Sequence, residues 1–176
     1  QCITHIKPLG DTLPKDTTET SPLKPILPRL QCITHITPFC EKLAKNTTLL
    51  ELHFVRVGLD CLHIIPLALA ISINTHLRTL ILRGNPLGCP EELAEALAAN
   101  QHLEVLDLSE TLMGPECLNR LAGALARTSS LRALNISKNK GINSCINQAM
   151  ESLAAALRVN SSLTTLIFTE SDISNW

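Results

Sequence analysis

Cysteine and histidine pairs are the residues of this chain whose types and spacing could do chemistry. Cys2 and His5 form one Cys-x-x-His pair, and Cys32 and His35 form another. Two such pairs could supply the four sulfur and nitrogen ligands of a tetrahedral zinc site. Both pairs belong to the hexapeptide QCITHI, which occurs twice, so a single duplication also explains them. We expect no metal or other cofactor, and the sequence leaves open whether these two pairs bind a metal.

No group of residues in the sequence matches a known catalytic arrangement. Cys61 and His63 form a shorter Cys-x-His pair, and two residues do not make a metal site. A cysteine nucleophile needs a histidine base and a third group that orients the base. The sequence contains no G-x-S-x-G elbow, no H-E-x-x-H zinc motif and no G-x-x-x-x-G-K-[ST] phosphate loop. We therefore expect no enzyme activity within these residues.

The bulk composition limits the class of protein. The chain has 176 residues, of which 45% are hydrophobic and 18% charged, enough for one folded domain with a sizeable core. A net charge of −1 and only three Phe, one Trp and no Tyr argue against a nucleic-acid partner. The apolar run at 62–73 is too short to cross a bilayer and contains Pro66, so we expect no membrane span. Because the chain begins at Gln1, we interpret it as a piece of a longer protein.

An apolar-x-x-Leu-x-apolar segment recurs five times, and it predicts the elements that must position any functional residue. The separations between successive starting positions are 77−49=28, 103−77=26, 131−103=28 and 163−131=32. Repetition at this scale indicates a solenoid, in which each unit covers the apolar face of the unit before it. The five starting residues are Leu49, Leu77, Leu103, Leu131 and Leu163.

Each repeat predicts a short strand, a turn and a helix. In the second repeat, Leu80 and Leu82 alternate with outward-facing neighbours, so these two leucines point toward the core. Parallel strands joined by helices predict an α/β solenoid with strands on the concave face and helices on the convex face. The predicted domain organisation is a Pro-rich irregular segment at 1–30, a degenerate cap at 31–48 with a helix at 39–46, and repeats over 49–176.

The cysteine content favours a reducing compartment. Seven cysteines are an odd number, and Cys61, Cys89, Cys117 and Cys145 are evenly spaced along the chain (89−61=28, 117−89=28 and 145−117=28). This spacing follows the repeat and predicts small buried thiols where each loop enters its helix. We expect a cytoplasmic protein, and we attribute the three Asn-x-Ser/Thr sequons to chance; they begin at Asn46, Asn135 and Asn160.

The repeat unit resembles the leucine-rich repeat, whose pattern is L-x-x-L-x-L-x-x-N-x-L followed by a helix. LRTLILRGNPL at 77–87 matches every specified position. With such long periods and a full helix in each unit, the stretch 49–176 resembles the ribonuclease-inhibitor-like subclass. That subclass includes the sensor domains of NOD-like receptors and effectors that intracellular bacteria inject into hosts. The resemblance implies a horseshoe segment that binds proteins.

Departures from the repeat pattern identify its weak points. The asparagine that bonds to the turning backbone is replaced at three of its five positions: Val57, Asn85, Thr111, Asn139 and Ser171. Because a valine side chain cannot hydrogen-bond, we expect a looser turn in the first repeat. We also expect the extra length of the fourth repeat to form a bulging turn at 138–147, and a final helix or cap to lie beyond the last strand.

The outward-facing strand residues are the predicted binding surface. Ile81, Val105 and Ile167 are apolar on this face and predict a sticky strip. Arg83, Asp107 and Glu51 predict charged contacts that orient a partner. The full set of outward positions is Glu51, His53, Val55, Thr79, Ile81, Arg83, Val105, Asp107, Ser109, Ala133, Asn135, Ser137, Thr165, Ile167 and Thr169.

The predicted function is non-catalytic recognition of a protein partner through the concave face and the loop edges. A cytosolic immune-type sensor and a bacterial effector secreted into the host cytosol both fit the resemblance. The alternative is a substrate-recruiting or regulatory part of an enzyme, such as a ubiquitin ligase, whose catalytic domain lies outside these residues. The sequence gives neither the partner's identity nor the oligomeric state.

Overall fold

The computed structural model describes residues 27–88, 91–140 and 146–169 of the chain. Strands and helices alternate through these residues, as the repeats predicted. The helices are α1 Leu27–Ala44, α2 Cys61–Ile73, α3 Glu91–Ala99, α4 Pro115–Leu125 and α5 Ile146–Val159. The strands are β1 Glu51–His53, β2 Thr79–Ile81, β3 Val105–Asp107, β4 Ala133–Asn135 and β5 Thr165–Ile167.

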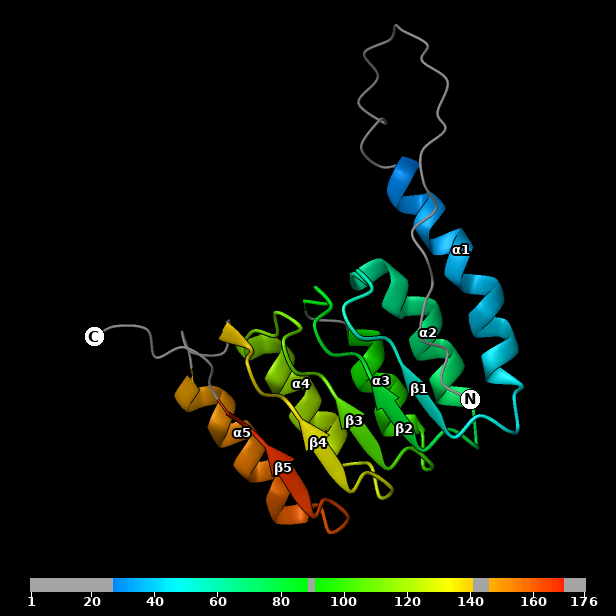
Figure 1. Cartoon of the computed structure of the whole chain (residues 1–176). Helices are drawn as coiled ribbons and strands as arrows, with labels where there is room; N and C mark the ends of the chain where they lie inside the picture. The colour runs from blue at the N-terminus through cyan, green and yellow to red at the C-terminus, as the bar shows by residue number, and fades with distance from the viewer. Residues whose placement is uncertain (1–26, 89–90, 141–145, 170–176) are drawn as a thin grey trace, which may run out of the picture.

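The five strands form one parallel sheet in the order of the sequence, β1 to β5. Each connection runs through a helix, which returns the chain to the same end of the sheet and so makes the next strand parallel. Figure 1 shows the strands side by side in one layer, with α2 to α5 in a second layer behind them. Among the described elements, this arrangement leaves one face of the sheet without a covering helix.

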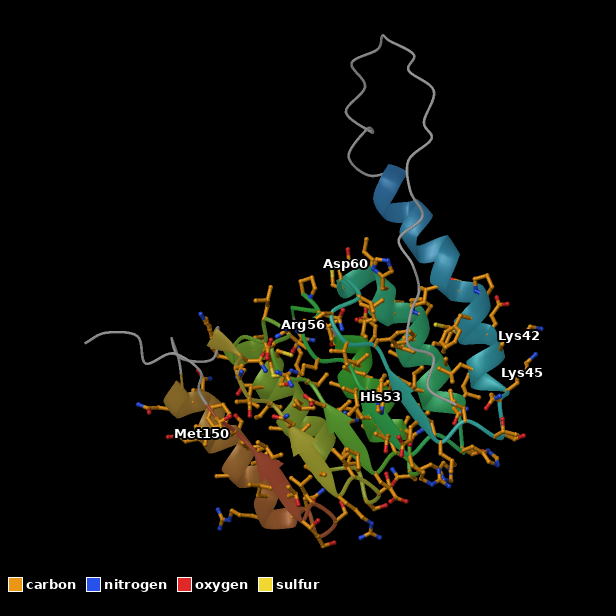
Figure 2. All side chains as sticks on the ribbon, viewed as in Figure 1. Lys42, Lys45, His53, Arg56, Asp60 and Met150 are labelled. Carbon is orange, nitrogen blue, oxygen red and sulfur yellow. The ribbon has the colours of Figure 1, made fainter. Side chains whose placement is uncertain are left out.

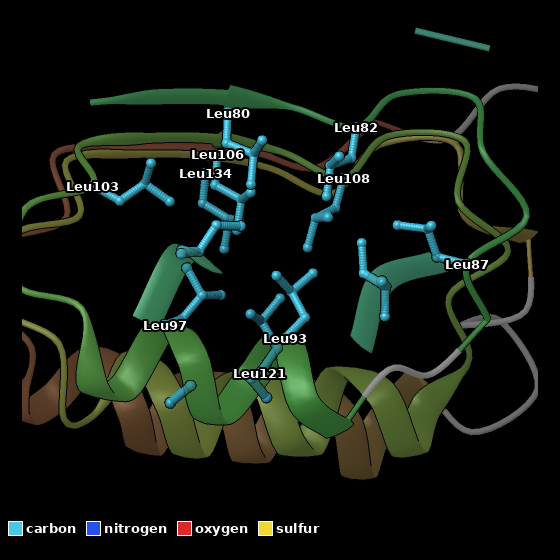
Figure 3. Close-up of a cluster of buried hydrophobic side chains, with 14 of the residues drawn as sticks. Leu80, Leu82, Leu87, Leu93, Leu97, Leu103, Leu106, Leu108, Leu121 and Leu134 are labelled. Atoms are coloured by element: carbon cyan, nitrogen blue, oxygen red, sulfur yellow. The ribbon is translucent and has the colours of Figure 1, made fainter. Parts of the chain in front are cut away.

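Leucine side chains fill the space between the sheet and the helices. Leu80, Leu106 and Leu134 occupy one position of three paired strands, and each is buried. Leu93 and Leu121 reach them from α3 and α4 (Figure 3). Complete burial of a leucine contributes roughly 1.5–3 kcal/mol, and the same position is filled in each repeat. The core is therefore a continuous column that holds the strands in register.

The first helix closes the N-terminal end of the repeats. It packs against α2, where Cys40 and Leu43 join the core and Phe39 meets Phe54 edge to face at 5.7 Å between ring centroids. The helix predicted at 39–46 was too short, because α1 begins at Leu27, inside the segment predicted to be irregular. Pro38 lies inside α1 and its side chain is exposed, so its ring faces away from the core.

Within the described residues, no helix combines the length and apolarity that a membrane crossing requires.

The cysteines only partly follow the prediction of buried thiols. Of the four cysteines in that prediction, Cys117 is buried but Cys61 is exposed at the first turn of α2. Cys89, Cys145 and the predicted bulge around Cys145 lie outside the described residues.

Candidate protein-binding surface

The strand register arranges the predicted binding residues in rows across the open face of the sheet, which we call the strand face. The first row consists of Glu51, Thr79, Val105, Ala133 and Thr165. The second row consists of His53, Ile81, Asp107, Asn135 and Ile167. All ten side chains are exposed or half-buried, in contrast to the buried leucines between them on β1 to β4. Alternation along each strand therefore separates a core side from a solvent side as predicted.

A third row follows where the strands pass into their turns, and the structure corrects the prediction there. Beyond the strands, backbone hydrogen bonds still join neighbouring repeats. The accepting carbonyls belong to Arg83, Ser109, Ser137 and Thr169, and each accepts from the N–H of a turn residue in the repeat before: Arg56, Gly84, Glu110 and Lys138, respectively. Ser109 and Ser137 were expected to be exposed, but each is only 3% exposed. The Ser137 hydroxyl also accepts a hydrogen bond from the N–H of Thr169. These two serines are not part of the solvent-exposed surface.

The predicted apolar strip is interrupted. Ile81 and Val105 lie on adjacent strands in different rows, and Val105 pairs with Ala133 in its own row. Asp107 and Asn135 stand between Ile81 and Ile167 in the second row. The apolar centre of the strand face is therefore the diagonal group Ile81, Val105 and Ala133, without Ile167.

The side chain of Asp107 accepts hydrogen bonds at the end of its own strand and from the neighbouring strand. One carboxylate oxygen accepts from the N–H of Ser109 at 2.8 Å, and the other accepts from the Asn135 amide at 3.2 Å. The Asn135 oxygen accepts in turn from the N–H of Ser137 at 3.1 Å. Both carboxylate oxygens of Asp107, which was predicted as a charged contact for a partner, thus already accept hydrogen bonds within the protein.

A cluster of four charged residues lies at the edge where the strands end; we call it the edge cluster, and it consists of Arg56, Arg83, Glu110 and Lys138. Arg83 donates to one oxygen of Glu110 through Nε at 3.2 Å and Nη2 at 2.8 Å. Arg56 Nη2 donates to the other oxygen at 2.5 Å, and Lys138 Nζ lies 3.6 Å from the carboxylate. Hydrogen bonds from Arg56 and Arg83 lower the pKa of Glu110 to about 2.

The left-handed turn of each repeat positions the edge cluster. Arg56, Gly84, Glu110 and Lys138 occupy the same place in four consecutive repeats, with φ of 52°, 73°, 59° and 62°. A β-carbon added at Gly84 would overlap the Cγ of Arg56. Glycine at this position therefore supplies the positive φ and also lets the Arg56 side chain cross the backbone to reach Glu110. Figure 2 labels Arg56 beyond the strands, at the same edge as Asp60.

The asparagines of the repeat hold the turn of the preceding repeat. Asn85 accepts from the N–H groups of Val57 and Leu59, each at 3.1 Å, and donates to the carbonyls of Phe54 and Leu82, each at 2.7 Å. Asn139 makes the equivalent bonds to the turn that contains Thr111 and Met113.

This direction of bonding corrects the prediction for the first turn. The turn at Val57 is held by Asn85, so it does not need an asparagine of its own. The substitution that matters is Thr111, whose hydroxyl donates to the carbonyl of Leu108 at 2.7 Å. In the turn before it, the N–H of Leu87 donates to the carbonyl of Asn85 within the same turn.

A second series of asparagines at the opposite ends of the strands was not predicted. Asn74 donates to the carbonyls of Leu43 and Asn46 at 2.7 and 3.0 Å, and accepts from the N–H groups of His76 and Leu77. The other asparagines that bond in this way are Asn100 and Asn160. The sequence signal for this second series is that asparagines recur with the repeat period at positions 46, 74 and 100 (74−46=28 and 100−74=26).

The side chains of Cys32 and His35, one of the two predicted Cys-x-x-His pairs, lie outside the described part of the structure. Cys2 and His5 lie outside the described residues. His63 is engaged at the start of α2, where its Nδ1 lies 2.7 Å from a carboxylate oxygen of the N-cap residue Asp60. Hydrogen bonds from His63 and Leu62 lower the pKa of Asp60 against the opposing effect of burial, which is the largest single cause. Among the described side chains, no group of three or more His, Cys, Asp or Glu could hold a metal ion.

Comparisons with known proteins agree with this architecture. A family model described as a leucine-rich repeat matches residues 74–88 and 99–116. Among solved structures, the chain is similar to one named leiomodin-1 actin-binding site 2, with a TM-score of 0.68, 17% identity and coverage of 73% of this chain and 76% of that one. It is also similar to the tropomodulin C-terminal domain of Caenorhabditis elegans, with a TM-score of 0.60, 19% identity and coverage of 78% and 84%. The chain is an α/β leucine-rich-repeat solenoid.

Proposed function

We propose that this chain is a non-catalytic module that binds a protein partner through the strand face and the turns at its edge. The observation that carries the proposal is the strand face itself, an open sheet surface opposite a well-packed helical layer. A rigid scaffold presents such a surface without a large ordering cost on binding. The apolar centre at Ile81, Val105 and Ala133, with charged groups around it, has the arrangement of an interface, an apolar core within a polar rim.

The proposed setting is the cytoplasm, in a ribonuclease-inhibitor-like protein such as an immune-type sensor or a bacterial effector acting in its host. The long repeat period and the full helix in each unit support this subclass. Cys40 and Cys61 are free thiols, which supports a reducing compartment. Burial raises the pKa of Cys40 to about 11, so this thiol stays protonated and inert as a core residue.

Actin is the first purified protein to test as a partner. The solved domain with a TM-score of 0.68 is named as an actin-binding site of leiomodin-1. At 17% identity the likeness extends to the fold alone. The proposal therefore commits to a protein partner on the strand face, and co-sedimentation with filamentous actin decides whether actin is that partner.

The test is affinity capture from a cytosolic extract with a variant that blocks the strand face. Thr79→Arg and Ala133→Arg place two bulky charges on either side of Val105, and both positions are at least partly exposed. The matched control carries Ala99→Arg and Ala154→Arg, on exposed positions of α3 and α5. We expect the control to retain the captured proteins and the strand-face variant to lose them. Equal capture by both variants would reject the strand face as the binding surface.

A further inference from the structure

The edge cluster carries more positive charge than its own carboxylate neutralises. Arg56, Arg83 and Lys138 surround Glu110, which leaves a formal charge of +2 (three cations minus one anion). Their side chains are 64%, 43% and 42% exposed, whereas that of Glu110 is 21% exposed. The most shielded member of the cluster is thus the anion, and the cations face solvent.

Both arginines keep donors for a second anion. Arg83 uses Nε and Nη2 for Glu110, and Arg56 uses Nη2 alone. Within the described residues, the remaining guanidinium N–H groups of these two side chains have no hydrogen-bond partner. An arginine fork held from one side by a carboxylate presents its other edge in a geometry that suits another carboxylate.

The structure holds these cations in place before a ligand arrives. Arg56 crosses the backbone at Gly84, and Glu110 joins the side chains of three repeats. The lowered pKa of Glu110, about 2, reflects the positive surroundings that its hydrogen-bond donors create. Since long charged side chains lose rotamer freedom on binding, fixing them in advance favours association.

An apolar contact lies within reach of the same ligand. Ile81 stands two positions before Arg83 along the chain, a separation of about 6.6 Å in an extended backbone. Val105 lies on the next strand, and both side chains are half-buried. The strand-face residues include no Phe, Tyr or Trp on which a nucleic-acid base could stack, so the combination of cations and aliphatic groups favours a peptide.

We propose that the edge cluster binds an acidic segment of the partner protein, with a carboxylate on the guanidinium N–H groups of Arg56 and Arg83 that Glu110 leaves free, near Lys138, and an aliphatic side chain on Ile81 and Val105. This inference rests on the proposed function and names the chemistry of its partner. In an extended peptide, residues two positions apart share a face, so an acidic and an aliphatic residue at that separation match the spacing of Arg83 and Ile81 on the strand.

The experiment measures the binding of labelled octapeptides by fluorescence anisotropy. The probe repeats two glutamates followed by two leucines, which places glutamate and leucine two residues apart on each face of an extended chain. The same peptide with glutamine in place of each glutamate serves as its uncharged control. The edge variant carries Arg56→Gln and Lys138→Gln, and the matched variant carries Arg127→Gln and Arg158→Gln, which removes two charges from the exposed helical side. We expect the edge variant to bind the acidic probe about tenfold or more weakly, because it loses charge-assisted hydrogen bonds, and the matched variant to change little.

A second measurement on the unaltered protein covers the case in which the edge variant fails to fold. Backbone amide resonances of Arg83, Gly84 and Glu110 should shift when the acidic peptide is added. Equal weakening in both variants, equal binding of the glutamine peptide, or an absence of these shifts would overturn the proposal. Tighter binding of an octathymidylate that is lost in the edge variant would also overturn it, in favour of a phosphate ligand. Each of these failures leaves the capture test with Thr79→Arg and Ala133→Arg independent, so the two proposals fail separately.

Discussion

Arg83 donates twice to a single carboxylate oxygen of Glu110, through Nε at 3.2 Å and Nη2 at 2.8 Å, across the boundary between two repeats. Arg56 of the repeat before binds the other oxygen. One carboxylate thereby joins the turns of three consecutive repeats, in addition to the backbone bonds of the sheet. The repeats of a solenoid otherwise contact mainly their neighbours, so the Arg56–Glu110 pair adds a direct link between the first and third repeats.

Replacing Glu110 by Gln should change how stability depends on acidity. The folded state lowers the pKa of this carboxyl from 4.5 to about 2, so its ionised form contributes stability above pH 4.5. That contribution is lost as the pH falls from 4.5 toward 2, when the folded protein takes up the proton. Urea unfolding midpoints measured over this range should fall less steeply in Glu110→Gln than in the unaltered protein. Parallel curves for the two proteins would contradict the role of Glu110.

Replacing Gly84 by Ala should both strain the backbone and displace Arg56. A positive φ costs a residue with a β-carbon about 1–2 kcal/mol, and the added atom would overlap the Arg56 side chain. Gly58 also has a positive φ, but an added β-carbon there meets nothing within 4 Å, so Gly58→Ala isolates the backbone strain. By NMR titration, the pKa of Glu110 should rise in Gly84→Ala and stay near 2 in Gly58→Ala. An unchanged Glu110 in both variants would show that Arg56 does not need the space at Gly84.

Replacing Asn85 by Ala should be among the more damaging single changes in the repeats. It leaves two N–H groups and two carbonyls of the adjoining turns without their side-chain partner. Loss of such partners in a buried site costs about 2–4 kcal/mol in the free energy of unfolding. The exposed Asn147 on α5 provides a control, for which Asn147→Ala should change the urea midpoint little. Similar losses in both variants would mean that the side chain of Asn85 does not hold the turn.

Replacing Thr111 by Asn should stabilise the protein. Asn139 and Asn85 show that an asparagine at this place accepts two N–H groups from the preceding turn. At position 111 those groups belong to Asn85 and Leu87, beside a small apolar hollow that Thr111 helps to line. Because the Leu87 N–H already donates to the carbonyl of Asn85, the gain comes from pairing the Asn85 N–H, which should raise the free energy of unfolding by about 1 kcal/mol, measured by urea denaturation. A lower unfolding free energy would indicate that the longer side chain does not fit the hollow.

The periodic leucines predicted the architecture because burial is specified by residue type at the same place in each unit. Leu52, Leu80, Leu106 and Leu134 have one environment, so one pattern in the sequence describes them all. The strand face followed from simple alternation. The exposure of its third row could not be predicted from alternation, because the burial of Ser109 and Ser137 depends on how closely neighbouring turns approach.

The roles of the asparagines and of the edge cluster could not be predicted without knowing how the repeats stack. The sequence shows that Val57 replaces an asparagine, but not that each asparagine serves the turn before it. Asn160 begins a sequon, yet its amide nitrogen donates to two backbone carbonyls of the preceding repeat and is part of a structural series. Arg56, Glu110 and Lys138 share a column when the repeats are aligned, and only the left-handed turn brings their side chains together.

Site-specific photo-crosslinking tests the binding role of the strand face most directly. A p-benzoyl-phenylalanine residue is placed at Thr79 on the strand face or at Ala99 on the exposed side of α3. After irradiation in cytosolic extract, mass spectrometry measures the partner peptides joined to each position. We predict a partner adduct at position 79 and none at position 99. An adduct at position 99, with none at position 79, would contradict recognition through the strand face.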